Sequence, residues 1–337
     1  MEIILAGVFI AVVIMGANVL ALRNNESEKA VFRWLLFVLN MPLLLLGLGL
    51  MLAPAEFFDQ LIEQAGNQVF VTGENIKAMG PSVLFMALWG MATSLRPIQR
   101  LLARLIPIEP GSPVHTLALV LAGYLMGNTA LTLSQGGLEG LAETAVPTSL
   151  AFFAVSELLF AAIGFLGVGV FIRRDWRELM KRLGLVRPTS GQLVRGVGWI
   201  IVLVLLQIVA AGLWAILNPE QIATLEDINS VLLENVDTIP EWLVLALAAG
   251  IGEEILFRGA IQPVFGLWFT SIIFAVVHVQ YGFSPITLFV VLLAVILGLI
   301  RRRHNTTIAI FVHAGYNFVL GLLALLATYA EQFVMGG

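Results

Sequence analysis

The sequence predicts an all-α, polytopic bundle of about ten transmembrane helices. Hydrophobic residues make up 59% of the chain, charged residues make up only 12%, and the mean hydropathy is +0.95. These values lie outside the range of soluble domains. The apolar residues also gather in stretches of about 20, the length that crosses the hydrocarbon core of a bilayer as a helix. We therefore expect the chain to lie in a membrane.

Ten apolar windows qualify as spans, at least approximately. They cover residues 3–22, 34–53, 78–95, 113–133, 147–172, 196–217, 241–260, 265–281, 284–300 and 306–329. The third window is weak because it is short, and the eighth is weak because Gly266, His278 and Gly282 interrupt or bound it. Glu2 directly precedes the first window, and the window lacks a basic leading segment, which favours a retained span over a cleaved signal peptide.

Basic and acidic connections alternate along the predicted topology. The first, third, fifth and ninth connections are rich in Lys and Arg, whereas the second, fourth and sixth are acidic, with Lys77 as an exception. Short basic loops stay in the cytoplasm. Ten spans with both termini outside satisfy this pattern, so the net charge of -4 hides two oppositely charged faces. We expect a multi-pass protein of the cell membrane, inner or plasma.

The chain divides into two predicted regions and a connector. Residues 1–172 form an N-terminal accessory transmembrane region, residues 173–195 a basic cytoplasmic connector, and residues 196–330 the region that holds the polar motifs. The connector is expected to form a short amphipathic helix on the membrane surface before Pro188. Its lipid face would carry Trp176, Leu179 and Leu183. A charged connector without such a helix is the alternative.

Three short motifs place polar side chains inside apolar stretches near the C-terminus. GEEILFRG contains Glu253, Glu254 and Arg258, FAVVH contains Phe274 and His278, and HAGYN contains His313 and Asn317. An ionisable group in hydrocarbon costs roughly 2.5 kcal/mol or more on insertion scales, so a chain that keeps several there is expected to use them. The pattern predicts an intramembrane active site.

Helix geometry assigns roles within these motifs. Glu253 and Glu254 lie about 100° apart around an α-helix and cannot face one point. Arg258 follows Glu254 by four residues, the favourable spacing for an ion pair on one face. We therefore predict a structural pair of Glu254 and Arg258, which leaves Glu253 free for proton chemistry. By the same spacing, Phe274 shares a helix face with His278, and His313 shares one with Asn317.

One carboxylate, two imidazoles and an amide suit hydrolysis. Glu253, helped by His278, would deprotonate a water, and His313 with Asn317 would donate hydrogen bonds to the oxyanion formed at a peptide carbonyl. The same residues permit a metal version, in which Glu253, His278 and His313 hold a divalent ion such as zinc. Both versions stay open. The absence of cysteine excludes disulfides, thiolate metal sites and cysteine nucleophiles.

The remaining polar residues have less specific interpretations. Glu157 in the fifth window is expected to hydrogen-bond a neighbouring helix, with ligand sensing or capping of a polar cavity as alternatives. His115 and His304 lie near basic loop ends and are expected to be solvated. The run from Arg301 to Arg303 is most simply a topological anchor, and contact with anionic lipid is the second interpretation.

EEILFR, FAVVH and HAGYN resemble, in order, the motifs Glu-Glu-x-x-x-Arg, Phe-x-x-x-His and His-x-x-x-Asn of the CAAX protease and bacteriocin-processing (CPBP, or Abi) family. The resemblance covers residues 195–330 and makes the C-terminal region a CPBP-like intramembrane protease domain. It implies a membrane-embedded endopeptidase. Eukaryotic relatives remove the last three residues of prenylated CAAX proteins, and bacterial relatives include bacteriocin immunity and maturation proteins.

Carried onto this chain, the resemblance implies that Glu253 and His278 activate the water. It implies that His313 and Asn317 are oxyanion or metal partners. The family is commonly labelled metalloprotease, and a metal-free glutamate mechanism is also argued for it.

The expected partners are the bilayer and a peptide or membrane-protein substrate, with no nucleic acid. The active site would lie in the cytoplasmic half to the middle of the bilayer. The rival interpretation is a non-proteolytic immunity factor or scaffold, or a small-solute carrier that uses Glu253 and Glu254 as a proton relay. A carrier is expected to show two related halves with broken helices, and the sequence shows no such duplication.

Overall fold

The computed structural model describes residues 2–64, 72–282 and 284–335, and its regular structure is helical. Within these ranges the only strand-like pairing is an isolated bridge between Val170 and Arg174. The predicted all-α class is confirmed. Several helices have the length and composition of membrane spans, so the chain is a multi-pass membrane protein.

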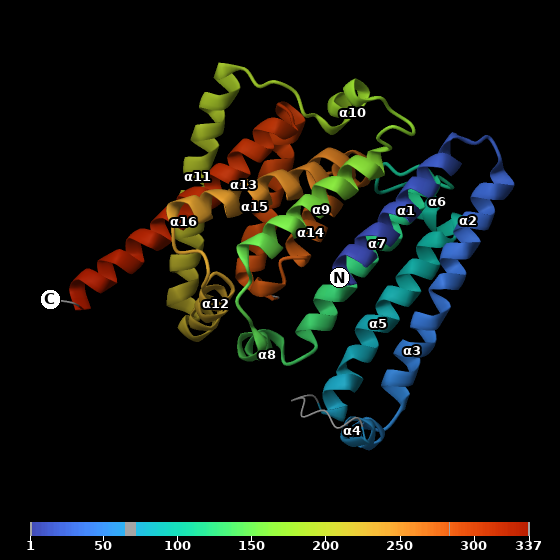
Figure 1. The fold of residues 1–337 in the computed structure, drawn as a ribbon, viewed down its shortest axis with the longest axis horizontal. Helices are drawn as coiled ribbons and strands as arrows, with labels where there is room; N and C mark the ends of the chain where they lie inside the picture. The colour runs from blue at the N-terminus through green and yellow to red at the C-terminus, as the bar shows by residue number, and fades with distance from the viewer. Residues whose placement is uncertain (1, 65–71, 283, 336–337) are drawn as a thin grey trace. The chain divides into compact units, whose positions relative to one another are not determined.

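The helices follow one another with short connections (Figure 1). In chain order they are α1 (Glu2–Leu22), α2 (Glu26–Leu39), α3 (Met41–Leu52), α4 (Ala55–Gln64), α5 (Gly73–Ser94), α6 (Arg96–Leu102), α7 (Pro113–Leu133), α8 (Gly137–Thr144), α9 (Leu150–Val168), α10 (Trp176–Leu183), α11 (Ser190–Leu217), α12 (Pro219–Leu232), α13 (Ile239–Glu253), the π-helix η1 (Glu254–Ile261), α14 (Gln262–Val276), the 3-10 helix η2 (Val279–Tyr281), α15 (Pro285–Arg303) and α16 (Thr306–Met335).

The predicted count of ten spans is not confirmed. Among the described residues, seven helices are long and apolar enough to cross a membrane. An eighth is added if α5 and α6, which meet at 91°, form one span. The seventh and eighth windows are joined in one helical stretch, Ile239–Val276, which runs through Pro263. Gly266 bends this stretch with φ 76°, a left-handed conformation that favours glycine.

Local sequence signals fix where two helices of the C-terminal half begin. α11 starts with a capping box, in which the Thr189 hydroxyl accepts from the backbone N–H of Gln192 and the Gln192 side chain accepts from that of Thr189. α13 starts with the same motif, formed by Thr238 and Glu241. Each box satisfies two backbone N–H groups that have no partner inside the helix. The start of α13 sets the register of the helix that ends at Glu253.

One compact unit comprises Ala17–Thr144 and Val276–Gly282. Inside it α5 packs against both α3 and α7 (Figure 1). The Trp89 indole of α5 donates a 2.7 Å hydrogen bond to the Leu119 carbonyl of α7, which ties these two helices together. The unit is thus a small helical bundle in its own right.

The other compact unit comprises Met1–Gly16, Ala145–Ala275 and Phe283–Gly337. Inside it α13 contacts both α9 and α16. The contact with α16 is close, because a Cβ atom at Gly250 would stand 3.0 Å from the backbone nitrogen of Ala314. Small residues allow such an approach of helix backbones in membrane proteins. The predicted functional division of the chain stays a prediction, because packing does not test it.

The predicted helix in the basic connector is present as α10, but its predicted lipid face is wrong for Leu179 and Leu183, whereas Trp176 is exposed. Leu179 and Leu183 are fully buried in a hydrophobic cluster with Ile255. The Trp176 ring stacks on Phe165, with 5.9 Å between ring centroids. The side of α10 that carries the two leucines therefore packs on protein beside η1.

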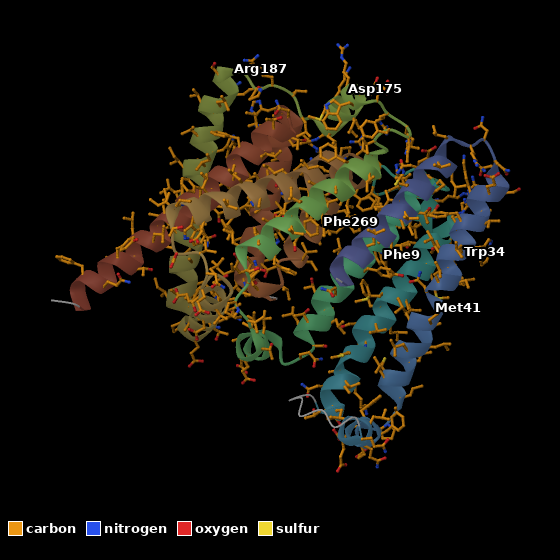
Figure 2. All side chains as sticks on the ribbon, in the orientation of Figure 1. Phe9, Trp34, Met41, Asp175, Arg187 and Phe269 are labelled. Atoms are coloured by element: carbon orange, nitrogen blue, oxygen red, sulfur yellow. The ribbon has the colours of Figure 1, made fainter. Side chains whose placement is uncertain are left out.

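Large apolar side chains are exposed over most of the long helices. Phe9, Trp34 and Met41, labelled in Figure 2, are examples on α1, α2 and α3. Contiguous exposed apolar surface is rare in soluble monomers. This surface matches the hydrocarbon of a bilayer and supports the multi-pass assignment.

Replacement of Gly250 by Ala is expected to lower the stability of the protein. The new methyl group would overlap Ala314 of α16, and overpacking of this kind costs about 1–3 kcal/mol. The measurement is the thermal unfolding midpoint of the detergent-solubilised protein. The matched control is Gly198→Ala in α11, where no atom lies within 4 Å of the added Cβ. Equal midpoints for the two variants would contradict the close contact of α13 with α16.

Candidate active site

The polar residues of the first motif lie where an α-helix becomes a π-helix. Glu253 is the last residue of α13, and Glu254 opens η1. A π-helix closes its hydrogen bonds over five residues and often occurs at functional sites. Glu254 and Arg258 therefore lie in a wider turn than the α-helix assumed from the sequence.

Glu254 and Arg258 form a buried ion pair. The Nε atom of Arg258 lies 3.3 Å from Oε2 of Glu254, and the two side chains are 1% and 0% exposed. The guanidinium carbon also lies 4.3 Å from the centroid of the Phe274 ring. A cation over an aromatic face gains stabilisation that increases when the pair is desolvated. Phe274 thus packs directly on the charged pair.

His313 of α16 joins this pair through the other oxygen of Glu254. Its Nδ1 atom lies 3.0 Å from Oε1 of Glu254, and its ring is edge-on to Phe274 at 6.0 Å between centroids. The Nε2 atom faces Glu253, at 4.0 Å from Oε2. A carboxylate at one ring nitrogen fixes the orientation of an imidazole. Glu254 therefore directs Nε2 of His313 toward Glu253.

The two glutamates differ in access. The Glu253 side chain is 13% exposed, whereas that of Glu254 is 0% exposed. Asn317 follows His313 by one turn of α16 and is half-buried, and its side chain makes no hydrogen bond to another described residue. Glu253 and Asn317 are therefore the partly exposed groups of this cluster, whereas the His313 side chain is only 5% exposed.

His278 lies in the compact unit of Ala17–Thr144 and Val276–Gly282. Its predicted position on a helix face shared with Phe274 is wrong, because α14 ends at Val276 and the chain turns there into η2. The imidazole is half-buried and stacks on Tyr281, with 6.3 Å between ring centroids. The partnership of His278 with Glu253 stays a prediction.

Glu157 of α9 is a neighbour of the site that the sequence did not reveal. The residue is buried, and a Cβ atom at Gly252 would stand 2.4 Å from its Oε2. That oxygen accepts no hydrogen bond from the described residues, so the predicted bond to a neighbouring helix is not formed there. A glycine directly before the two glutamates was the available signal for this close contact.

The geometry does not support the metal version of the site. Among the described residues, no three His, Asp or Glu side chains are grouped so that they could hold a metal ion. The zinc alternative with Glu253, His278 and His313 therefore rests on the sequence motifs alone.

We expect Glu254→Ala to be far more destabilising than Glu253→Ala. Removal of Glu254 leaves Arg258 buried without its carboxylate, and such a change costs about 3–5 kcal/mol. Glu253 lies at the accessible edge of the cluster, so its removal has a smaller cost. Thermal unfolding of both variants in detergent measures the difference. The assignment of Glu254 to support and Glu253 to chemistry fails if Glu253→Ala is the less stable variant.

Comparison with known proteins identifies the segment that carries these residues. Residues 235–319 match the family described as "Type II CAAX prenyl endopeptidase Rce1-like". Over 85 residues the chain is 36% identical to "Uncharacterized protein YpbD" of Bacillus subtilis (strain 168), a match that covers 25% of this chain and 43% of that relative. The chain thus spans less than half the length of this relative. No solved structure matches the chain. Residues 235–319 hold all three motifs, and the predicted family resemblance is confirmed for them as an Rce1-like segment.

Proposed function

We propose that this protein is an intramembrane endopeptidase of the CAAX-protease type, which hydrolyses a peptide bond in a peptide or membrane-protein substrate. The observation that carries the proposal is the 4.0 Å separation of Glu253 Oε2 and His313 Nε2, two groups on different helices with His313 oriented by Glu254. This arrangement offers a proton acceptor and a hydrogen-bond donor to one reacting centre. The Rce1-like segment supports the same reaction class.

Glu253 acts as the general base. It takes a proton from a water whose oxygen attacks the carbonyl carbon of the scissile bond, and His278 assists by holding that water. Protonated Glu253 then gives the proton to the amine nitrogen as the carbon–nitrogen bond breaks. A positioned acid or base contributes about 10²–10⁴-fold to such a reaction.

His313 and Asn317 stabilise the oxyanion of the tetrahedral intermediate. The Nδ1–H of His313 donates to Glu254, and a protonated ring leaves Nε2–H to donate to the oxyanion. The carboxylates of Glu253 and Glu254, which face the two ring nitrogens of His313, stabilise that protonated ring. The carboxamide of Asn317, one turn further along α16, supplies the second donor.

The rival scaffold interpretation draws on the burial of the ion pair. Glu254 and Arg258 are almost completely inaccessible and contribute to packing whatever the protein does. The Glu253 side chain is 13% exposed and does not share that complete burial, while its Oε2 beside His313 is itself buried. A purely structural cluster gives no reason for the difference between the two glutamates. The measurements below therefore centre on Glu253 and Asn317.

Glu253→Gln is expected to lower peptide cleavage by about 10²-fold or more, because the amide accepts no proton from water. The assay follows a panel of fluorogenic peptides, including a farnesylated CAAX peptide, cleaved by the purified full chain. Glu220→Gln in α12 is the matched control and should cleave at the wild-type rate. A Glu253→Gln protein that cleaves normally would refute the general-base role. A well-folded wild type that cleaves no member of the panel would shift weight to the scaffold interpretation.

The same assay with a chelator separates the two versions of the chemistry. Cleavage that persists in chelator assigns the reaction to the glutamate alone. Loss of cleavage that zinc restores assigns the metal version with Glu253, His278 and His313.

Asn317→Ala is expected to lower kcat by about 10²–10³-fold with little change in KM, the effect of removing one oxyanion donor. The comparison variant is Asn229→Ala in α12, which loses an intrahelical hydrogen bond to Leu225 and no oxyanion contact. Steady-state kinetics on the best peptide of the panel measure both constants. A rise in KM at unchanged kcat would instead assign Asn317 to substrate binding.

A further inference from the structure

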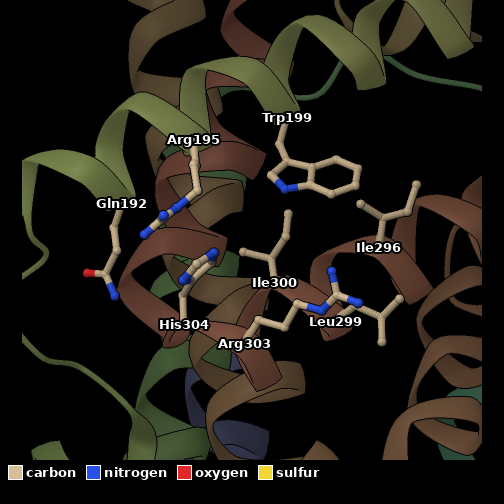
Figure 3. Close-up of a pocket in the computed structure, with 8 residues that line it drawn as sticks. All are labelled: Gln192, Arg195, Trp199, Ile296, Leu299, Ile300, Arg303 and His304. Carbon is tan, nitrogen blue, oxygen red and sulfur yellow. The ribbon is translucent and has the colours of Figure 1, made fainter.

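A cavity of about 530 Å³ lies between α11 and α15, apart from the candidate active site (Figure 3). Arg195 and Trp199 line it from α11, and Ile296, Ile300, Arg303 and His304 line it from α15 and its C-terminal cap. Its volume lies within the range of small-molecule sites, about 300–1,000 Å³. Neither glutamate of the first motif lines this cavity, so its ligand is a separate question.

The polar rim of the cavity is cationic. Arg195 and Arg303 carry two positive charges, and the half-buried His304 also lines the cavity. No Asp or Glu lines the cavity, and within the described ranges neither arginine forms an ion pair with a carboxylate. Two guanidinium groups on one cavity without a counter-charge create a site for an anion. Arg binds phosphate through two parallel hydrogen bonds.

The surrounding end of this compact unit is cationic as well. Arg182 of α10 donates a hydrogen bond to the Gly259 carbonyl and is partly buried. Burial, followed by repulsion from Arg174, Arg301 and Arg173, lowers the pKa of Arg182 to about 10. Arg301 belongs to the same last turn of α15 as Arg303. The positive electrostatic potential at this end of α15 thus favours a negatively charged ligand.

The cavity changes from polar to apolar along the helices. Arg303 ends α15, and Ile300 and Ile296 precede it on the same helix, so the apolar wall extends about 10 Å along the helix axis from Arg303 at 1.5 Å per residue. Trp199 follows Arg195 by one turn of α11, and tryptophan is enriched at membrane–water interfaces. An inorganic anion would occupy the rim alone. A ligand with an anionic head and an apolar tail matches both parts.

We propose that this cavity binds an anionic phospholipid. Arg195 and Arg303 hold the phosphate, and Trp199, Ile296 and Ile300 contact the first methylene groups of an acyl chain. Basic pockets between transmembrane helices at the cytoplasmic side have the chemistry for such headgroups. The proposal explains the basic run at the end of α15 more fully than a topological anchor does.

Bound lipid has a structural consequence for the site helix. α11 packs closely on α16, since a Cβ atom at Gly196 would stand 2.8 Å from Cδ1 of Phe311, and one at Gly315 would stand 2.3 Å from Cδ1 of Ile200. α16 carries His313 and Asn317. A ligand that holds α11 to α15 therefore stabilises the neighbour of the site helix, without any contact to the reacting groups.

The test is the thermal unfolding midpoint of the full chain in neutral detergent with added phosphatidylglycerol, compared with phosphatidylcholine of the same acyl chains. Phosphatidylglycerol is expected to raise the midpoint by several degrees more than phosphatidylcholine, because a ligand of the native state stabilises it. The double variant Arg195→Gln/Arg303→Gln should lose this difference, with lipid affinity weakened about tenfold or more. The charge-matched control Arg187→Gln/Arg302→Gln removes two exposed arginines that do not line the cavity and should keep it.

The other outcomes overturn the proposal. If both lipids raise the unfolding midpoint equally, the cavity has no role in binding anionic lipid. The same conclusion follows if the pocket and control variants lose the phosphatidylglycerol effect to the same extent. An equal rise with inorganic phosphate identifies a free anion as the ligand. A pocket variant that keeps the lipid effect and raises KM for peptides identifies a site for a substrate carboxylate. If the double variant does not fold, Arg303→Gln is compared with Arg302→Gln, its direct neighbour.

Discussion

The candidate site depends on one buried carboxylate. Glu254 offers one oxygen to Arg258 and the other to His313, so a single side chain joins the π-helix to α16. A carboxylate with no exposure is costly unless both oxygens meet cationic or hydrogen-bonding partners. Because Glu254 has both, the imidazole it holds is fixed, and the accessible Glu253 acquires a partner 4.0 Å away. The chemistry proposed for Glu253 therefore depends on Glu254, which itself takes no part in the proton transfer.

Close helix contacts keep that arrangement in place. Gly250 brings α13 against α16, and Gly252 brings it against Glu157 of α9. The π-helix widens the next turn, and Glu254 and Arg258 both face the interior of the unit. The helical stretch that contains them is also long enough to span a membrane. Phe274 closes the cluster from α14 by covering the guanidinium. Packing and charge thus position the same few residues.

Much of this could be read from the sequence, because composition and spacing carry it. The all-α membrane class follows from hydropathy, and the four-residue spacing of Glu254 and Arg258 places them within reach in the wider π turn as well. The π-helix itself has no sequence signal of its own. The end of α14 at Val276 was missed because no glycine or proline follows it before Gly282. The burial of Leu179 was missed because an amphipathic pattern does not distinguish lipid from a protein core. The predicted count of ten spans is not confirmed, and one source of the difference is that the seventh and eighth windows join without a loop.

The central claim is that Glu253 activates a water and does not attack the substrate itself. The most direct measurement is a single turnover of peptide in ¹⁸O-labelled water, followed by mass analysis of the product and of the protein. A general base predicts one solvent oxygen in the new carboxylate of the first product and no label in the protein. An unlabelled first product together with ¹⁸O in Glu253 would reveal an acyl-enzyme and contradict the claim.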